Sequence, residues 1–255
     1  MPVPEAIVLH GSDHRGVGEH TLATIGSSLA VATSAGAKPP SVPAVDGNED
    51  VGAIVSGSRA ELLIVADGHF GHEASELAVH HVLEALGDDP PPADLVDEEL
   101  VALFFDAGVA VQHETGRFDC PHPNSRTTLA LALVTDEIVQ WAALGDSCVI
   151  IAAGQWGVRL DTPRSAYLGS RFHVTDIAAA MTRGRLARTV WDALVLATDG
   201  LVDALGVADK DLATTVQREL GSRVGAEQLA DCLIQLALGH GAEDAVTIAV
   251  ARNRN

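Results

Sequence analysis

The sequence predicts an α+β fold in which antiparallel sheets and helices form a layered sandwich. Its apolar segments are short and come in pairs separated by turn residues, which is the pattern of β-hairpins. Helical patterns also come in pairs, and they do not alternate regularly with strands. Because a doubly wound parallel sheet needs that alternation, the order favours antiparallel sheets. We expect a single domain over residues 1–255, since 47% apolar residues are ample for a core.

The first elements are strands. Residues 1–20 are expected to be a peripheral or poorly ordered segment. Residues 21–33 are rich in Ala, Val, Ile and Ser and predict a strand or a hairpin. Residues 51–55 and 61–66 predict a hairpin that turns at Ser56-Gly57-Ser58.

A pair of helices follows. Apolar residues recur at helical spacing over residues 74–85, and Gly87 ends that run. Asp94 is the expected N-cap of a second helix that continues to about Glu114. A polar loop is expected from Gly116 to Ser125.

The second half of the chain repeats this scheme. Residues 127–135 with 138–144 predict one hairpin, and residues 148–152 with 156–160 predict another. Residues 161–192 show no regular pattern and hold a local excess of arginine, so we expect an irregular segment. The remaining predicted elements are a strand, two helices and a final strand, at residues 194–198, 208–220, 225–239 and 246–250.

The composition excludes several classes of partner. With 16 basic and 35 acidic residues, the formal net charge is −19, which repels nucleic acids and anionic lipids. No apolar stretch reaches the roughly 20 residues that span a bilayer, and no secretory signal is visible. The three cysteines, Cys120, Cys148 and Cys232, form no disulfide framework or paired zinc motif. We therefore expect a cytoplasmic protein, and a monomer, that binds neither nucleic acid nor membrane.

Three carboxylates lie at the ends of predicted buried strands. Asp67-Gly68-His69 follows the run 62–66, Asp199-Gly200 follows the run 194–198, and Asp244 precedes the last strand. A carboxylate beside an apolar strand is costly unless it is paired or binds a cation, and these motifs contain no Lys or Arg. A single Asp-Gly is usually a turn. The combination of three such sites predicts a centre for hard metal ions.

Such a centre favours hydrolytic chemistry. Carboxylate, carbonyl and water oxygens are the ligands that Mg²⁺ and Mn²⁺ prefer. Asp67 is placed to bridge two ions, with Asp199 and Asp244 completing one of them, and Asn48-Glu49-Asp50 offers two more carboxylates. Two such ions can activate a shared water and clamp a phosphate. His69 directly follows the shared ligand and is a candidate general acid for a leaving alkoxide.

The other histidines give weaker signals, because none of them has the spacing of a zinc motif. Those near the N-terminus are interpreted as part of a polar segment; they are His10, His14 and His20. A second group is interpreted as the solvent-facing or partly buried face of the first helix: His72, His80 and His81. A third group is interpreted as loop residues: His113, Cys120 and His122.

Six motifs occur in a fixed order along most of the chain. They are Asn48-Glu49-Asp50, Val65 to Gly71 continuing to Ala74, Thr127-Thr128, Ala143 to Ser147, Leu196 to Asp203, and Glu243 to Thr247. Together they resemble the metal-dependent protein phosphatases of type 2C, the PPM family. In the last motif the family usually has Asp-Asn ahead of the Thr, and this chain departs from that.

The resemblance implies a bacterial-type single-domain enzyme with a four-layer α-β-β-α sandwich, in which helix pairs flank two antiparallel sheets. A metal-bridging water would attack the phosphorus of phosphoserine or phosphothreonine without a covalent enzyme intermediate, and His69 would be the general acid. The implied partners are phosphoproteins, Ser/Thr kinases among them. The resemblance also implies the metal ligands. Asp67 would bridge two Mn²⁺ or Mg²⁺ ions. Glu49 or Asp50, with the Gly68 carbonyl, would bind one ion, and Asp199 with Asp244 would bind the other. Asp146 with Asp199 would bind a third, weaker ion.

Two departures from the family concern the substrate. The family usually has an Arg that holds the phosphate five residues before Asp50, where this chain has Val45, and loss of a bidentate guanidinium weakens phosphate binding. Lys38 or an Arg from residues 161–192 is a candidate replacement. That segment lies where the family has a substrate-shaping flap, and it looks shortened. Two alternatives therefore stay open: a weakly active or non-catalytic relative that serves as a regulatory scaffold, and a hydrolase of small phosphoesters.

Overall fold

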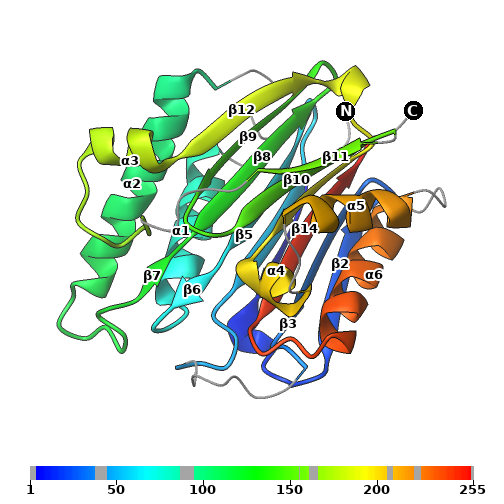
Figure 1. Ribbon diagram of the computed structural model, residues 1–255. Coiled ribbons are helices and arrows are strands. Elements are labelled where there is room, and N and C mark those ends of the chain that lie inside the picture. The colour runs from blue at the N-terminus through cyan, green and yellow to red at the C-terminus, as the bar shows by residue number, and fades with distance from the viewer. Residues whose placement is uncertain are drawn as a thin grey trace.

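Two six-stranded antiparallel sheets form the centre of the protein (Figure 1). The computed structural model describes residues 4–37, 45–86, 95–154, 156–160, 166–205, 209–220 and 225–253. In spatial order, the first sheet contains β1 (Glu5–His10), β4 (Val51–Ser56), β5 (Ala60–Ala66), β8 (Leu129–Thr135), β9 (Ile138–Leu144) and β12 (Thr182–Ala187). The second contains β11 (Trp156–Leu160), β10 (Cys148–Ala153), β13 (Ala193–Ala197), β14 (Val246–Arg252), β3 (Leu29–Ser34) and β2 (His20–Ile25). A short pair, β6 (Gly68–His69) with β7 (Arg126–Thr127), continues from β5.

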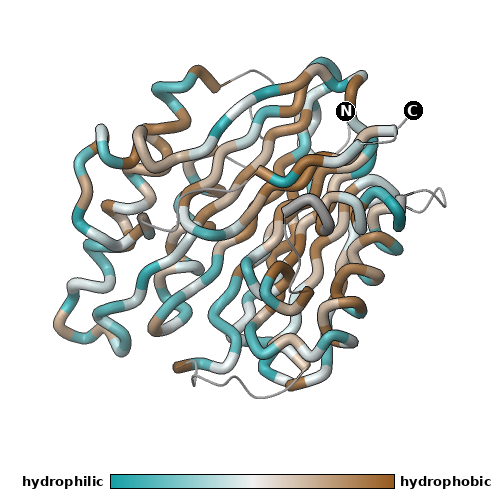
Figure 2. The backbone as a smooth tube through the Cα atoms, in the orientation of Figure 1, coloured by the Kyte–Doolittle hydropathy of each residue, from teal (hydrophilic) through white to brown (hydrophobic). Residues whose placement is uncertain are grey.

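Both faces of the central strands are buried, which explains why the sequence shows continuous apolar runs there. In β5, Leu62 and Ile64 pack on the helix side of the sheet, whereas Leu63 and Val65 pack between the two sheets. This alternation follows the two-residue period of a strand. Side chains from both sheets meet in the middle layer, so the sheets pack face to face. Figure 2 shows the central strands largely in the hydrophobic colours.

The helices cover the two outer faces in separate groups (Figure 1). The first sheet is covered by α1 (Glu73–Leu86), α2 (Asp97–Thr115) and α3 (Val174–Ala180). The second sheet is covered by α4 (Asp199–Leu205), α5 (Asp209–Leu220) and α6 (Ala226–Gly239). Two short 3-10 helices span Gly11–Asp13 and Arg188–Val190. The predicted α+β, four-layer α-β-β-α sandwich is therefore confirmed.

The sequence of α6 shows how a helix is fixed on its sheet. Leu229, Leu233 and Ala237 recur every four residues and are buried, together with Ala230 and Ile234. This spacing places all five side chains on one stripe of the helix, which packs on the second sheet. Figure 2 shows the hydrophobic and hydrophilic colours alternating along this helix.

Four elements differ from the sequence-based expectation. Residues 5–10, expected to be peripheral or poorly ordered, form β1, because they pair with β4 at one edge of the first sheet. Residues 166–192, within the segment expected to be irregular, contain α3 and the other edge strand, β12. Residues of β12 are only partly buried, so the strand carries no apolar run.

Helix α4 has seven residues, too few for a clear helical period, and was not predicted. Gly87 and the predicted N-cap Asp94 lie outside the described residues.

Candidate active site

The pairing of β4 with β5 brings Asp50 and Asp67 together. Val51, which begins β4, pairs with Ala66, which ends β5. Asp50 and Asp67 are the next residue on each side of that pair, so both lie at the same end of the first sheet. Both are buried, with 2% and 7% of their surface exposed.

The second sheet places Asp199 and Asp244 at this end of the sandwich. The backbone N–H of Thr198, which follows β13, donates to the carbonyl of Thr247 in β14 at 3.0 Å. Asp199 is the first residue of α4, and Asp244 lies two residues before β14. Gly200 lets the helix begin against the strand, because a Cβ there would overlap the carbonyl oxygen of Ala245.

A buried hydrogen bond joins the two halves of the site. Thr198 Oγ1 donates to Asp50 Oδ2 at 2.9 Å, and it accepts the backbone N–H of Thr247, also at 2.9 Å. Thr198 is fully buried, so water does not compete for its hydroxyl. This bond turns the Asp50 carboxyl group toward the second sheet.

A fifth carboxyl group comes from the connection between the sheets. Asp146 lies between β9 of the first sheet and β10 of the second. The hydroxyls of Thr128 and Ser147 are hydrogen-bonded at 2.7 Å, and Thr128 Oγ1 accepts the backbone N–H of Asp67 at 2.9 Å. Thr127 Oγ1 donates to the Asp67 carbonyl at 2.8 Å. The Thr127-Thr128 pair thus fixes the backbone that carries Asp67.

The proximity of these carboxyl groups raises their pKa values. Burial, followed by the charges of Asp50, Asp199, Asp244 and Asp146, raises the pKa of Asp67 well above its usual range. Burial and the charge of Asp244 do the same to the pKa of Asp50. Burial, followed by Asp146 and Asp244, raises the pKa of Asp199 to about 7. Such repulsion costs folding free energy, and a bound cation relieves it.

The donor atoms at this site fit a hard divalent cation. Asp67 Oδ2 and Asp146 Oδ1 are buried without a hydrogen-bonding partner within the described part of the chain. The ion pairs formed by Arg15, Arg117, Arg183, Arg188 and Arg218 involve none of these five carboxyl groups. Asp67, His69 and Asp146 each offer a ligand atom, and these atoms lie within 4.8 Å of one another. The carboxylate oxygens that dominate the site are the donors that Mg²⁺ and Mn²⁺ prefer.

Of the two neighbouring acids Glu49 and Asp50, only Asp50 faces this centre. Glu49 Oε1 accepts the backbone N–H of Val45 at 2.7 Å, and Glu49 Oε2 accepts that of Gly71 at 2.9 Å. The Glu49 carboxylate therefore closes the loop that leads to Asp50. Gly68 packs on the backbone of Glu49, where a Cβ would overlap the Glu49 carbonyl oxygen.

His69 lies beside Asp67, and one of its ring nitrogens has no hydrogen-bonding partner among the described residues. Its Nδ1 is 3.9 Å from Asp67 Oδ1, and its Nε2 is buried without a hydrogen bond to any described residue. Tyr167 packs edge-on against the ring at 4.9 Å between centroids, and its hydroxyl donates to Asp146 Oδ2 at 3.0 Å. Burial, followed by Asp146, raises the pKa of Tyr167 to about 12, so the hydroxyl stays a donor. Sequence reasoning missed Tyr167, whose only signal was that it is the single tyrosine of the chain.

Phe70 and Arg126 form an exposed border next to His69. Phe70 has a φ of 64°, the only positive φ outside glycine among the described residues, and 58% of its surface is exposed. A left-handed backbone costs an L-residue roughly 1–2 kcal/mol, and such strain often marks functional sites. Arg126 pairs with His69 across β6 and β7, and its guanidinium carbon lies 5.9 Å from the centre of the Phe70 ring. This register gives the site a cation that sequence reasoning did not identify.

Two of the arginines suggested as replacements for the missing guanidinium at Val45, Arg183 and Arg188, are held by other groups. Arg183 Nε donates to Asp97 of α2 at 3.1 Å. Arg188 Nη1 donates to the Thr135 carbonyl at 2.7 Å, at the far end of β8 from the carboxylate centre. Lys38 and Arg164 lie outside the described residues.

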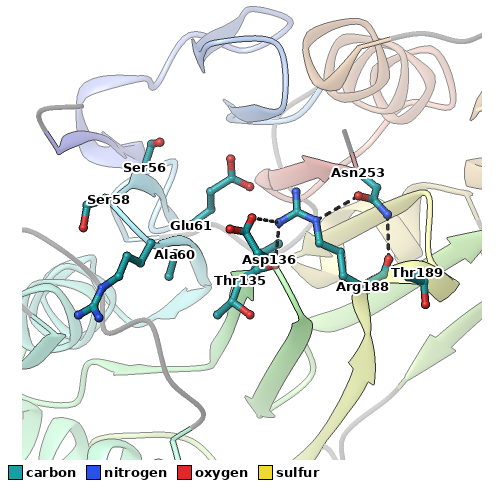
Figure 3. A pocket seen from close by; sticks show the side chains of 12 residues that line it. Ser56, Ser58, Ala60, Glu61, Thr135, Asp136, Arg188, Thr189 and Asn253 are labelled. Atoms are coloured by element: carbon teal, nitrogen blue, oxygen red, sulfur yellow. Dashed lines mark hydrogen bonds and ion pairs between the residues drawn. The ribbon is translucent and has the colours of Figure 1, made fainter. Parts of the chain in front are cut away.

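A cavity of about 650 Å³ lies at that far end of the sandwich (Figure 3). Its lining includes the turn between β4 and β5, Thr135, Asp136, Arg188 and Asn253. Arg188 is already held there by Asn253 Oδ1 at 3.2 Å and by Asp136 at 3.6 Å, as the dashed lines in Figure 3 mark. The groups suited to catalysis therefore gather at the opposite end, around Asp67.

Comparison with protein families identifies the chain. The family model described as protein phosphatase 2C matches residues 46–235, which is most of the sequence. The chain belongs to the protein phosphatase 2C family. The matched range includes Asp50, Asp67, Asp146 and Asp199, and Asp244 follows it.

Solved structures of phosphatases share the protein phosphatase 2C fold of this chain. Serine/threonine phosphatase Stp1 from Staphylococcus aureus is 20% identical with a TM-score of 0.69, covering 93% of this chain and 95% of that chain. The serine/threonine phosphatase PstP/Ppp from Mycobacterium tuberculosis is 23% identical with a TM-score of 0.64, covering 89% and 100%. The catalytic domain of PstP in complex with two manganese ions is 24% identical with a TM-score of 0.63, covering 91% and 99%. A search of curated proteins returns no match.

Because these structures are only 20–24% identical to the chain, the similarity establishes the fold but not the activity. In the described part of the chain, no helix is both long and apolar enough to cross a membrane.

Proposed function

We propose that this member of the protein phosphatase 2C family is a metal-dependent phosphoprotein phosphatase that hydrolyses phosphoserine and phosphothreonine. One observation carries the proposal: carboxyl groups from both sheets converge at one end of the sandwich. There, buried oxygens of Asp67 and Asp146 have no hydrogen-bonding partner among the described residues. The two manganese ions in the PstP catalytic domain support the same chemistry.

In this proposal two Mn²⁺ or Mg²⁺ ions would share Asp67 as a ligand. Asp50 and the Gly68 carbonyl would hold one ion, and Asp199 with Asp244 would hold the other. Asp146 with Asp199 would hold a third. When bound, such ions supply Lewis-acid activation of a water nucleophile and neutralise the charge of the phosphate. Glu49, which the resemblance offered as an alternative ligand, would act instead by closing the loop that carries Asp50.

His69 is the proposed general acid. Its unpartnered Nε2 can carry a proton to the serine or threonine alkoxide as the phosphorus–oxygen bond breaks. A p-nitrophenolate leaving group is a much weaker base and needs no such proton. His69→Asn should therefore slow hydrolysis of a phosphothreonine peptide more than hydrolysis of p-nitrophenyl phosphate.

The test measures hydrolysis of both substrates with Mn²⁺ and with EDTA. We expect both to be hydrolysed only with the metal. Asp199→Asn should lower kcat by about 100-fold or more, since a carboxylate ligand of the proposed centre is lost. Asp106→Asn, on the exposed face of α2, is the matched control and should keep full activity. Full activity of Asp199→Asn would show that the metal assignment is wrong.

The same assay separates the alternatives. Turnover of the small ester alone would favour a small-phosphoester hydrolase, and metal binding without turnover would favour a regulatory scaffold. Val45→Arg should lower KM if the missing guanidinium limits phosphate binding. A phosphoprotein substrate, a Ser/Thr kinase as partner, a monomeric state and a cytoplasmic location stay predictions.

A further inference from the structure

We propose that the protein carries a second metal site of a different chemical kind, beside the loop that leads to Asp50. Its ligands would be Asp46, His72, Glu73 and His122, and its ion a zinc-class transition-metal cation. Each of these four residues offers one ligand atom, and the four atoms lie within 4.8 Å of one another.

Three segments distant in the sequence supply these donors: the loop before β4, the start of α1 and the loop after α2. His72 Nδ1 lies 2.6 Å from Asp46 Oδ2. His122 Nδ1 lies 2.7 Å from Glu73 Oε1 and 3.7 Å from Asp46 Oδ2. Ligand atoms around a tetrahedral Zn²⁺ are roughly 3.3 Å apart at its usual bond lengths. The three separations differ from that value by about 0.7 Å or less, which small side-chain rotations cover.

Burial and charge favour a cation at this point. The side chains are shielded, with 12% of Asp46, 17% of Glu73 and about a quarter of each histidine exposed. Two imidazole nitrogens approach the same Asp46 oxygen, so a divalent ion can accept both lone pairs and neutralise both carboxylates. Arg15 is the described arginine that pairs with Asp46, and its Nη1 is 3.9 Å away at the other carboxylate oxygen.

The surroundings have the features that support metal ligands. A metal-bound histidine usually has a carboxylate or carbonyl at its other ring nitrogen, and ligating carboxylates are hydrogen-bonded themselves. Here His72 Nε2 lies 3.9 Å from Glu76 Oε1, and Asp46 Oδ2 accepts the backbone N–H of His72 at 3.2 Å. Gly71, at a φ of 117°, makes room for the cluster, because a Cβ would overlap the ring of His122 and the carboxylate of Glu73.

The imidazole donors distinguish this site from the carboxylate centre. Imidazole suits zinc, copper, iron and nickel, whereas an oxygen-only centre suits magnesium and manganese. A groove of about 510 Å³, whose lining includes Glu73, Glu76 and Cys120, gives an ion access. Zn²⁺ should therefore bind here while Mg²⁺ fills the carboxylate centre around Asp67.

The bound ion would hold the loop that carries Asp50. Glu49 Oε2 accepts the backbone N–H of Gly71, the residue directly before His72. The ion would thus connect the loop at Asp46, the start of α1 and the loop at His122, and would position Asp50 through them. From the sequence, His72 and His122 were interpreted as a helix-face residue and a loop residue, since only folding brings them together.

The experiment measures Zn²⁺ binding by the full chain in saturating Mg²⁺ at pH 8, by calorimetry with a competing chelator. An alkaline pH is chosen because protons compete with the ion. Burial lowers the pKa of His72, but the hydrogen bond to Asp46 and the charges of Glu76, Asp46 and Glu73 together raise it. Co²⁺ serves as a second probe, since its visible spectrum reports imidazole coordination. The variants are His122→Ala and Glu73→Gln. Glu73→Gln keeps the size and polarity of the side chain, so it still tests the site if His122→Ala fails to fold. His240→Ala is the control, an exposed histidine at the C-terminal end of α6, which packs on the second sheet.

We expect wild type and His240→Ala to bind one more Zn²⁺ than His122→Ala. Glu73→Gln should bind that ion at least about 10-fold more weakly, because a ligating carboxylate is lost. The same ion should remain in Asp199→Asn, which separates this site from the proposed catalytic centre. Equal stoichiometry and affinity in wild type, His122→Ala and Glu73→Gln would overturn the proposal. Loss of all Zn²⁺ binding in Asp199→Asn would overturn it too, by assigning the ion to the carboxylate centre.

Discussion

Replacing Asp199 with asparagine should stabilise the metal-free protein while it removes the proposed activity. Burial, followed by the charges of Asp146 and Asp244, raises the pKa of Asp199 to about 7, against an ordinary value of 3.8. The fold therefore favours the neutral acid, and the ionised form lowers the free energy of unfolding. Asparagine keeps the shape of the side chain and removes the charge, so it removes this penalty.

The two pKa values give the size of the effect. The difference between 7 and 3.8 is about 3 pH units, and each unit corresponds to 1.36 kcal/mol, so the penalty is about 4 kcal/mol at most. The side chain is partly exposed, and solvent screening reduces that figure to about 2–4 kcal/mol at pH 8. For a chain of this length, the gain corresponds to a rise in Tm of about 5–10 °C.

The sign of the pH dependence follows from the direction of the shift. Because the folded pKa is raised, the penalty is complete above pH 7 and decreases as the pH falls from 7 toward 3.8. Below 3.8 both states hold the proton and the penalty is absent. The advantage of Asp199→Asn should therefore be largest at pH 8 and fall to less than about half by pH 5.

The assay is thermal unfolding in EDTA, followed by circular dichroism at pH 8 and pH 5. Asp106→Asn is the control, since it removes one exposed charge from α2, and Asp106 is not among the charges that shift the pKa of Asp199. Added Mn²⁺ should raise the Tm of wild type more than that of Asp199→Asn, because ligand binding stabilises the fold that holds the ligands. An unchanged Tm for Asp199→Asn at pH 8, or an equal gain at both pH values, would refute the reasoning.

Three further predictions concern neighbouring residues. Tyr167→Phe removes the hydrogen bond to Asp146 and should lower the free energy of unfolding by about 1–2 kcal/mol in urea denaturation; no change would mean that water replaces the hydroxyl fully. Arg126→Ala should raise KM for a phosphothreonine peptide by about 3- to 10-fold with little change in kcat, because the exposed Arg126 beside His69 attracts the phosphate dianion. An unaltered KM would exclude Arg126 from phosphate binding. Gly200→Ala should lower the free energy of unfolding by about 2 kcal/mol or more, since α4 must move away from its neighbouring strand; unaltered urea unfolding would contradict that close contact.

The sequence predicted the central strands and most of the helices well, because their burial leaves a local pattern. The run from Leu62 to Ala66 is apolar on both faces, since one face packs under helices and the other against the second sheet. The signal is weaker at the edges of the sheets, where β2 and β11 were predicted but β1 and β12 were not. β12 is at most partly buried and is more polar, whereas β1 holds only a short apolar run, Ala6 to Leu9.

The sequence predicted which acidic residues lie at strand ends in the candidate site, but not the directions in which their side chains point. Asp67, Asp199 and Asp244 follow or precede apolar runs, which is visible in one dimension. Whether Glu49 or Asp50 faces the centre depends on hydrogen bonds to residues about 20 and 150 positions away. Tyr167 reached the site from a segment that carries no recognisable motif.

By itself, the sequence determined the fold class, the order of most elements and the chemistry that its acidic motifs can perform. Those properties depend on residues within a few positions of one another, where spacing and polarity act directly. Only the tertiary structure decided which side chains meet. Thr198 contacts Asp50, and His72 approaches His122 through Asp46, because strand pairing and loop packing close those distances. Contacts of this kind depend on the packing of the whole chain, which leaves no local pattern in the sequence.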